Sequence, residues 1–378
     1  MRILQLAPLA ETVPPPAYGG IEAVVSVLCD ELVRRGVDVT LCASGDSLTS
    51  ARLQSVYDRS LRTAHDLENP SPYEWMHAAL SLREAEGYDL IHNHAGELAM
   101  AMSHLVDAPM LTTMHCLITP DTQLVWDSYR GWYNTISHAQ RATMPEISGG
   151  CFAGVVHNAI DVESFPFSGQ KDDYLLFLSR ISPEKGTHLA IEAASRLGVR
   201  LIIAGKVDRV DRAYYHEVVE PLIDGEQVVF LGEADASFKR DLYQRASCLL
   251  MPSCWEEPFG LVMVEAMACG TPVVAFARGA APEIVVDGVT GYLVEDVDGM
   301  VEAVRNAERI DPARCRQHVS DRFSPQVMAE RYLASYRTIL DRTARQRPLA
   351  LPPTRVAPLP AVGATGDGEK VAFGRGVP

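Results

Sequence analysis

Short apolar runs alternate with helical patterns through the first half of the chain. The runs are rich in Val, Ile and Leu, and turns containing glycine, proline or polar residues separate them. Runs of this kind, without polar alternation, are typical of strands that are buried on both faces of a parallel sheet. We therefore expect strands over Ile3–Ala7, Val37–Ala43, Asp89–His92, Met110–Met114, Asn134–Ser137 and Val155–His157.

The same rhythm starts again in the second half, after a stretch that fits neither a strand nor a helix. Residues 161–169 contain proline, glycine and polar residues that break both periods, so we place a domain boundary near Phe167. Two doubly wound α/β domains are predicted, at residues 1–167 and 168–323, with a cleft between the carboxyl ends of their strands. The second set of strands is expected over Tyr174–Ser179, Leu201–Ala204, Val228–Leu231, Cys248–Met251, Val273–Phe276 and Tyr292–Val294.

Two helices stand out from the polar pattern. The first begins at Ile21, has apolar residues at helical spacing and meets a stop at Gly36. The second has an N-cap at Ser324 with proline at the next position, and it closes the fold over residues 324–345. Residues 346–378 are rich in proline and glycine and are expected to form a disordered tail. The stripe on the second helix is Met328, Tyr332, Tyr336, Ile339 and Leu340.

The formal net charge of -15 narrows the class of partner. An acidic protein repels phosphate polyanions, which argues against nucleic acid and disfavours an anionic membrane surface. The apolar run at the N-terminus is too short for a signal peptide or a membrane span, which predicts a cytoplasmic protein. Eight cysteines without a C-x-x-C pair indicate buried reduced thiols.

Candidate motifs follow the first strand of each domain, where open α/β sheets bind ligands. Gly19 and Gly20 precede the helix from Ile21, so backbone N–H groups and the helix dipole can meet a phosphate or sugar oxygen. Taken alone, this glycine pair is equally compatible with a plain turn. Arg180 and Lys185 lie in one loop of the second domain, where two cations would suit a departing diphosphate.

The strongest candidate site lies within residues 251–274. A strand ends at Pro252, a loop carries Glu257, and a helix begins near Gly260. Glu265 falls in the second turn of this otherwise apolar helix, and burying a lone carboxylate is costly unless a hydroxyl or a cation meets it. Vicinal hydroxyls of a ligand would supply that partner, and Gly260 permits a close backbone approach. An exposed glutamate on an amphipathic helix is the alternative interpretation.

Together these motifs resemble the retaining glycosyltransferases of family 4. Seven residues separate Glu257 from Glu265, and the stretch continues as Glu265-Ala-Met-Ala-Cys-Gly-Thr-Pro-Val-Val. It is preceded by Arg180-Ile-Ser-Pro-Glu-Lys-Gly. The resemblance runs from the first strand to about Leu340 and implies the GT-B fold. In that fold two Rossmann-like domains face a central cleft, and the C-terminal helix crosses back.

The resemblance implies a role for each matching residue of the second domain. Glu265 would hold the ribose hydroxyls of a nucleoside diphosphate sugar, and Glu257 would face the donor sugar. Arg180 and Lys185 would grip the diphosphate and stabilise its charge as it departs, and the departing phosphate would take the acceptor proton. Further donor contacts would come from Gly19, Gly20, Phe259, Gly260 and Leu261.

First-domain residues match the family less specifically. His115, in Thr113-Met114-His115, resembles the histidine that contacts the donor sugar, and His94 matches a common H-x-H motif. A lone histidine such as His115 would more often be structural, so its interpretation depends on the family pattern, and by spacing alone His94 is equally compatible with packing. Ser137 and Arg141 resemble a hinge motif S-x-x-x-R, and we place them on the acceptor side. Trp126 belongs to an aromatic loop that could stack on an acceptor ring or merely pack.

Two positions depart from the family pattern. Ala159 stands where the family usually has glycine, which leaves a required positive φ in doubt. Gly279-Ala280 replaces a common pair of glycines. Neither change removes a chemical group.

Two stretches narrow the subgroup. Residues 204–211 and 255–259 are similar to those of bacterial UDP-glucose:tetrahydrobiopterin glucosyltransferases and natural-product relatives. They imply a UDP-sugar donor and a small soluble acceptor, such as a pteridine. Lys206 would lie near the nucleotide, although a solvated surface lysine is equally compatible. Asp296-Val297-Asp298 is interpreted as a polar surface turn, so neither a metal nor another cofactor is expected.

Other functions stay open from the sequence. One is a transferase that uses a GDP-sugar and a lipid or polysaccharide acceptor. Another is a UDP-sugar epimerase or hydrolase of the same fold, and a third is a non-catalytic subunit that binds sugar nucleotides. The sequence also leaves open whether the chain forms a homodimer.

Overall fold

The computed structural model describes residues 1–64 and 67–346. Within these ranges, the first sheet has seven parallel strands in the order β3-β2-β1-β4-β5-β6-β7. The central strands are buried on both faces, including polar side chains such as Gln5, His92 and Thr113. The strands are β1 Arg2–Leu6, β2 Asp38–Cys42, β3 Arg52–Gln54, β4 Leu90–Asn93, β5 Met110–Met114, β6 Trp132–Thr135 and β7 Cys151–Val155.

The second sheet repeats this arrangement. In the part of the chain that is described it has six parallel strands, in the order β10-β9-β8-β11-β12-β13. Both sheets therefore reverse their strand order beside the first strand, between β1 and β4 and between β8 and β11. The strands are β8 Tyr174–Leu178, β9 Arg200–Ala204, β10 Val228–Phe230, β11 Cys248–Met251, β12 Val273–Phe276 and β13 Gly291–Val294.

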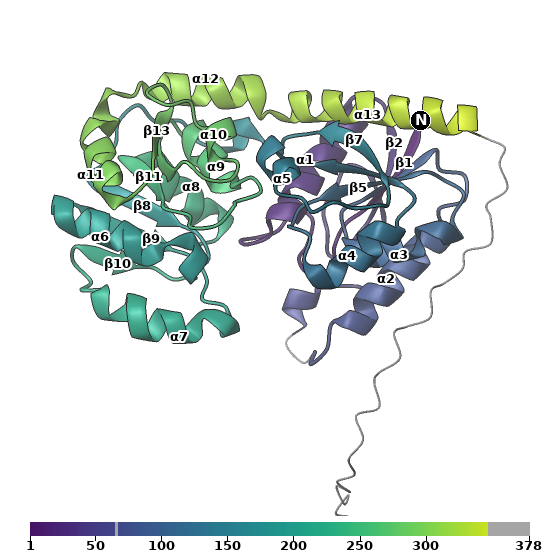
Figure 1. Ribbon diagram of the computed structural model, residues 1–378, viewed down its shortest axis with the longest axis horizontal. Coiled ribbons are helices and arrows are strands. Elements are labelled where there is room, and N and C mark those ends of the chain that lie inside the picture. The colour runs from purple at the N-terminus through teal and green to yellow at the C-terminus, as the bar shows by residue number, and fades with distance from the viewer. Residues whose placement is uncertain (65–66, 347–378) are drawn as a thin grey trace, which may run out of the picture.

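Helices cover both faces of each sheet, and the two lobes lie side by side (Figure 1). In the first lobe, α1 and α13 pack on one face, and α2, α3 and α4 on the other. The helices of this lobe are α1 Gly20–Arg34, α2 Ser71–Arg83, α3 Glu97–Met102, α4 Pro120–Ser128 and α5 His138–Ala142. Those that follow β8 are α6 Thr187–Leu197, α7 Arg212–Tyr214, α8 Ala236–Arg245, α9 Leu261–Ala268, α10 Ala281–Ile284, α11 Val297–Asn306, α12 Pro312–Arg322 and α13 Pro325–Gln346.

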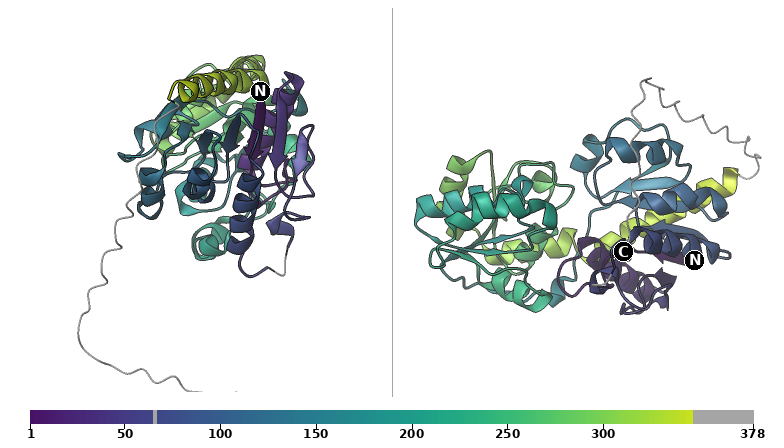
Figure 2. Two further views of the ribbon diagram at one scale, coloured as in Figure 1. Left: turned by 90° about the vertical axis from the view of Figure 1, so that its right-hand side faces the viewer. Right: turned by 90° about the horizontal axis from the view of Figure 1, so that it is seen from below.

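The last helix, α13, leaves the second lobe and packs against the first, as the GT-B fold requires (Figures 1 and 2). Its stripe was predicted correctly, because Met328, Tyr332, Tyr336 and Ile339 are each at most 1% exposed in the first-lobe core. The predicted tail falls from residue 347 onward outside the described residues. Within the described ranges, no helix is both long enough and apolar enough to span a membrane.

Most strand predictions are confirmed, and the largest errors lie at the two edges of the first sheet and in β6, beside one edge. Strand β7 ends at Val155, where the predicted strand began, and its first residues are exposed. Edge strands lack a continuous buried run, so their sequence signal is weak. The edge strand β3, Arg52–Gln54, was missed for the same reason. Strand β6 starts two residues before the predicted Asn134.

The predicted turn at Asp296–Asp298 is wrong, because these residues start α11. The side chain of Asp296 caps the helix by accepting a hydrogen bond of 2.9 Å from the backbone N–H of Gly299. Among the described residues, no group of three or more His, Cys, Asp or Glu side chains could hold a metal ion.

The cysteines form no disulfides in the described residues, and the backbone is unstrained at the two positions that depart from the family pattern. All eight cysteines are unpaired, but Cys116, Cys151 and Cys254 are exposed, so the prediction of buried thiols is wrong for these three. No non-glycine residue in the described ranges has a positive φ, Ala159 included, and Ala280 has a φ of -79°. Neither alanine is strained.

Candidate active site

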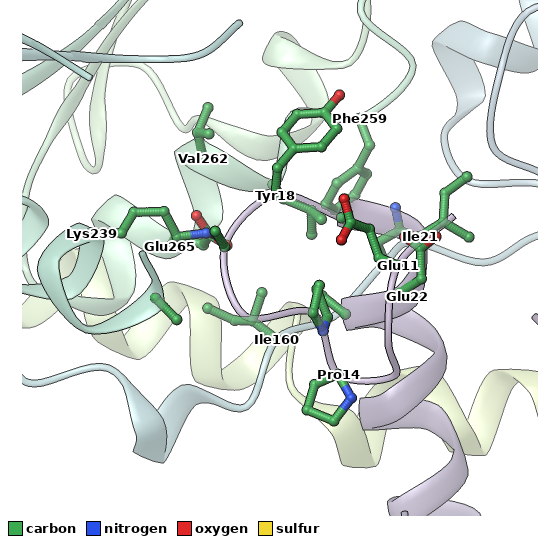
Figure 3. Close-up of a pocket in the computed structure, with 18 of the residues that line it drawn as sticks. Glu11, Pro14, Tyr18, Ile21, Glu22, Ile160, Lys239, Phe259, Val262 and Glu265 are labelled. Atoms are coloured by element: carbon green, nitrogen blue, oxygen red, sulfur yellow. Dashed lines mark hydrogen bonds and ion pairs between the residues drawn. The ribbon is translucent and has the colours of Figure 1, made fainter. Parts of the chain in front are cut away.

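A cavity of about 1580 Å³ lies between the carboxyl ends of the two sheets. The first lobe contributes the β1–α1 loop and the start of α1, and the second contributes the loops after β8, β9, β10 and β11. Figure 3 shows the two walls, with Glu11 and Glu22 on one side and Lys239 and Glu265 on the other. The cavity therefore lies where strand order reverses, which is the usual ligand site of open α/β sheets.

The predicted glycine pair forms the N-terminus of α1 in this cavity. Gly19 is the N-cap, with a φ of 144° that favours glycine. A Cβ on Gly20 would lie 3.3 Å from Cδ1 of Leu261, so the loop touches the start of α9 across the cavity. Backbone N–H groups at the start of α1 can meet an anionic or sugar oxygen there.

Arg180 reaches the cavity from the loop after β8, where the sequence predicts a diphosphate-binding cation. Its guanidinium donates to Glu184 and lies 3.7 Å from Asp208 and 4.0 Å from Asp211. Three carboxylates therefore orient this cation in the cavity wall. A guanidinium held in this way needs little reorganisation when an anion arrives.

Lys185 projects from the same loop and pairs with Glu257. Its ammonium donates to the carboxylate and lies 4.7 Å from the ring centroid of Trp255, whose Nε1–H also donates to Glu257 at 3.1 Å. The turn that carries Lys185 packs directly on the β11–α9 loop, because a Cβ on Gly186 would lie 2.1 Å from the carbonyl oxygen of Pro252. Lys185 and Glu257 thus form one unit in the cavity wall.

Glu265 lies in the second turn of α9 and is only 7% exposed. This burial excludes the alternative of an exposed glutamate, and the protein itself already supplies a cation and a hydroxyl as partners. Lys239 donates to one oxygen at 3.0 Å, and the hydroxyl of Tyr243 donates to the other at 2.8 Å. Burial, followed by the charge of Glu265, raises the pKa of Tyr243 well above its usual value. Because Glu265 also lines the cavity, its remaining lone pairs can accept from ligand hydroxyls.

His115 is the predicted histidine that reaches the cavity, and His94 lies behind it. Nδ1 of His94 is 2.9 Å from Nε2 of His115. Burial lowers the pKa of His115 to about 4, so the ring is neutral at pH 7. Phe259, Gly260 and Leu261 also line the cavity, as predicted.

Two family models match this chain. The model described as Glycosyltransferase Family 4 matches residues 18–145, and that described as Glycosyl transferases group 1 matches residues 162–318. The chain belongs to the family 4 glycosyltransferases. It is therefore a retaining hexosyltransferase with the GT-B fold that uses a nucleotide sugar as its donor.

Relatives cover nearly the whole transferase. The D-inositol 3-phosphate glycosyltransferase of Mycolicibacterium smegmatis is 28% identical over 88% of this chain and 89% of its own. AviGT4, a glycosyltransferase involved in avilamycin A biosynthesis, is 26% identical, covers 90% of this chain and 98% of its own, and has a TM-score of 0.70. HepE of Anabaena, solved with UDP and glucose, is 19% identical with a TM-score of 0.68, and covers 89% and 100%.

The residues predicted on the acceptor side do not line the cavity of the transferase. Trp126 is 2% exposed in the first-lobe core, where its Nε1–H donates to Glu97 at 3.1 Å. Ser137 is buried and caps α5, and Arg141 lies over the ring of Phe152 beside a separate hollow. His94 is buried behind the cavity wall and contacts His115. The other aromatic residues of the loop also pack: Tyr129, Trp132 and Tyr133 are buried.

The side chain of Lys206 extends across the cavity to the first lobe rather than into bulk solvent. Its ammonium lies 3.1 Å from Asp208 and 4.0 Å above the ring centroid of Tyr18, which belongs to the other lobe. The sequence did not single out Tyr18, although it directly precedes the glycine pair. A cation–π contact of this kind contributes about 1 kcal/mol and draws the two lobes together.

A second bridge between the lobes was also missed. Arg62 donates to Glu11 at 2.7 Å and to Glu233 at 2.6 Å, and both carboxylates line the cavity. The three residues come from separate loops, and Glu233 lies in the second lobe. No local pattern links positions 11, 62 and 233, so only the fold shows this contact.

We expect Glu265→Gln to weaken UDP binding by about 2 kcal/mol, which is about thirtyfold in Kd. Glutamine keeps the shape and can still accept from Tyr243, but it loses the charge that would strengthen hydrogen bonds from the hydroxyls of a bound nucleotide. Isothermal titration with UDP measures the effect. Glu283→Gln is the matched control, because Glu283 pairs with His157 at 2.9 Å outside the cavity. An unchanged Kd in Glu265→Gln would show that Glu265 is purely structural.

Proposed function

We propose that this transferase moves a hexosyl group from a UDP-sugar to a small acceptor such as a pteridine or a natural product, in the cytoplasm. One observation carries the proposal: Arg180, Lys185 and Glu265 line a single cavity that also exposes His115 of the opposite lobe. Such a cavity can hold a ribose, a diphosphate and a hexose in that order. HepE, solved with UDP and glucose, supports the choice of nucleotide.

The chemistry follows from where the charges lie. The bond between C1 of the hexose and the β-phosphate oxygen breaks while the acceptor oxygen bonds to C1 on the same face, which retains the configuration. The acceptor proton moves to the departing phosphate. Arg180 and Lys185 stabilise the negative charge of that phosphate, and this stabilisation is the protein's main contribution to catalysis.

The acceptor side of the cavity is acidic, which favours an acceptor without a phosphate group. Glu11 and Glu22 line the first-lobe wall, and the nearby Arg62 is already bound to Glu11. Glu22 is 4% exposed, and burial raises its pKa to about 6. An anionic acceptor would meet like charge here, whereas neutral hydroxyls can donate to these carboxylates.

Thermal unfolding with a panel of nucleotides tests the donor. UDP at a hundred times its Kd should stabilise the protein by about 2.7 kcal/mol, whereas GDP and ADP should give little shift. Stabilisation by GDP or ADP alone would overturn the choice of UDP. Rapid consumption of UDP-glucose without any acceptor would instead indicate a hydrolase or an epimerase.

The acceptor is tested in a separate assay, by the mass of the product formed from UDP-glucose. A neutral cyclitol and the same cyclitol with one phosphate make a matched pair that differs only in charge. We expect the phosphorylated member to be the poorer acceptor because of the carboxylates on the first-lobe wall. Preference for the phosphorylated member would contradict this assignment but leave the donor assignment standing.

A further inference from the structure

A buried chain of polar side chains runs from His115 in the cavity to the crossover helix α13. It lies on the strands β1, β4, β5 and β6, and nothing in the proposed chemistry uses it beyond His115. Every member is at most 2% exposed, so each polar atom needs a partner inside the protein. The members are Gln5, His92, His94, Thr113, Asn134, Tyr332 and Tyr336.

The end of the chain far from the cavity fixes the direction of its hydrogen bonds. The backbone carbonyl of Thr135 can only accept, so the amide nitrogen of Asn134 faces it at 3.3 Å. The amide oxygen of Asn134 must then accept from the hydroxyl of Thr113, at 2.8 Å. This uses the one proton of Thr113. His92 must therefore donate to Thr113 through Nε2–H at 2.7 Å, and Tyr332 donates to it at 3.0 Å.

The same logic continues to the cavity. A neutral His92 that is protonated at Nε2 has a bare Nδ1, which accepts from the hydroxyl of Tyr336 at 2.7 Å. Because the hydroxyl proton of Tyr336 is already donated to His92, the hydroxyl oxygen accepts a hydrogen bond from the amide nitrogen of Gln5 at 3.2 Å. The amide oxygen of Gln5 then accepts from Nε2–H of His94 at 3.0 Å. The bare Nδ1 of His94 accepts from Nε2–H of His115 at 2.9 Å.

All three rings are neutral, which this assignment requires. Burial lowers the pKa of His92 and of His94 well below the usual value, and that of His115 to about 4. A protonated, charged histidine at any of these three positions would carry N–H donors on both ring nitrogens. Two donors would then face each other across one short contact. Nδ1 of His115 is thus the free end of the chain, and it is a hydrogen-bond acceptor.

We propose that Tyr336 is a positioning residue of this transferase. Through the side chains between them, it holds His115 in the tautomer whose Nδ1 accepts a hydrogen bond from a hydroxyl of the donor hexose. The role rests on the proposed function, in which His115 faces the donor sugar. The helix α13 would thus influence the active site through Tyr336, although Tyr336 itself does not touch the substrate.

Nitrogen NMR of the full chain, labelled with ¹⁵N at histidine, tests the tautomer directly. At pH 7 with UDP present, we expect His92, His94 and His115 to be protonated at Nε2 and bare at Nδ1. The signals are assigned by their loss in single histidine variants. In Tyr336→Phe the anchor is gone, so His115 should populate both tautomers. A proton on Nδ1 of His115 in the unmodified protein would overturn the proposal, and this readout needs no turnover.

Kinetics of two matched variants separate positioning from stability. Tyr332 and Tyr336 are both 0% exposed on α13, and their rings stack with centroids 6.0 Å apart. Tyr332 donates into the chain from the side and is not on the route to His115. We expect Tyr336→Phe to lower kcat about tenfold with KM for the donor unchanged, whereas Tyr332→Phe keeps kcat within about twofold and loses similar stability.

Two outcomes of this comparison are decisive. Equal losses of kcat in Tyr332→Phe and Tyr336→Phe would overturn the positioning role, because both variants then act only through packing. If the unmodified protein does not turn over UDP-glucose, the proposed donor fails. The NMR result then still decides the tautomer.

Discussion

Replacing Lys185 by alanine is expected to lower kcat/KM for the nucleotide sugar about a thousandfold while the protein stays folded. The ammonium of Lys185 is the cation that pairs with Glu257 in the cavity wall, so its loss removes positive charge where we propose that the diphosphate departs. It also leaves Glu257 as an unneutralised carboxylate beside that phosphate. Glu257 keeps its hydrogen bond from Trp255 and faces the open cavity, so folding survives. Steady-state kinetics and a thermal melt measure both effects.

Lys171 offers the matched control for this experiment. Its ammonium lies outside the cavity and donates to the carbonyls of Gln244 and Cys269 and to the hydroxyl of Thr271. Burial lowers its pKa to about 8, and Lys171→Ala leaves buried acceptors without a donor. We expect that variant to melt earlier yet to keep kcat/KM within about twofold. A Lys185→Ala protein with more than a tenth of normal activity would contradict the assigned role.

The sequence predicted the fold best where strands are buried on both faces. β11 and β12 have the predicted bounds, because a continuous apolar run marks a strand with helices on both sides. β5 also has the predicted bounds, with the β-branched residues Thr112 and Thr113 at its centre. The edge strands β3 and β7 gave no such run. The start of α11 was misread because an aspartate that caps a helix and an aspartate in a turn look alike in sequence.

At the active site, the sequence predicted which residues reach the cavity but not what holds them. Lys239 and Tyr243 stand four residues apart on α8, so both face Glu265 from one side of the helix, and that spacing could have been noticed. The bridge made by Arg62 could not, since it joins loops that are far apart in the chain.

The histidines also show that the sequence predicts which residues reach the cavity but not which residues hold them. The motif around His115 indicated a ligand contact, and His115 does line the cavity. In our proposal, the tautomer of His115 depends on Tyr336, more than two hundred residues away in the sequence. Trp126 shows the reverse case, because an aromatic loop beside a predicted cleft turned out to be core.

Gly279 holds the loop that carries Glu257 without touching any ligand itself. Its φ is +54°, and a Cβ there would lie 2.3 Å from the backbone nitrogen and 2.5 Å from the backbone oxygen of Glu257. Its own N–H donates to Glu256 at 2.9 Å, and the next N–H, of Ala280, donates to the carbonyl of Glu257 at 2.9 Å. The loop after β12 therefore fixes the position of the Lys185–Glu257 pair.

We expect Gly279→Ala to lower kcat/KM about a hundredfold, because a methyl group in this contact must push the Glu257 backbone by about 1 Å. Gly288→Ala is the matched control: Gly288 has a φ of +70°, but its Cβ would meet nothing within 4 Å. Both variants lose about 1 kcal/mol of stability to the left-handed backbone. Gly279→Ala should also melt earlier than Gly288→Ala because its Cβ meets backbone atoms of Glu257, so both activities are measured well below the two melting temperatures. Only Gly279→Ala should lose activity. Equal activity in the two variants would mean that the position of Glu257 does not limit the reaction.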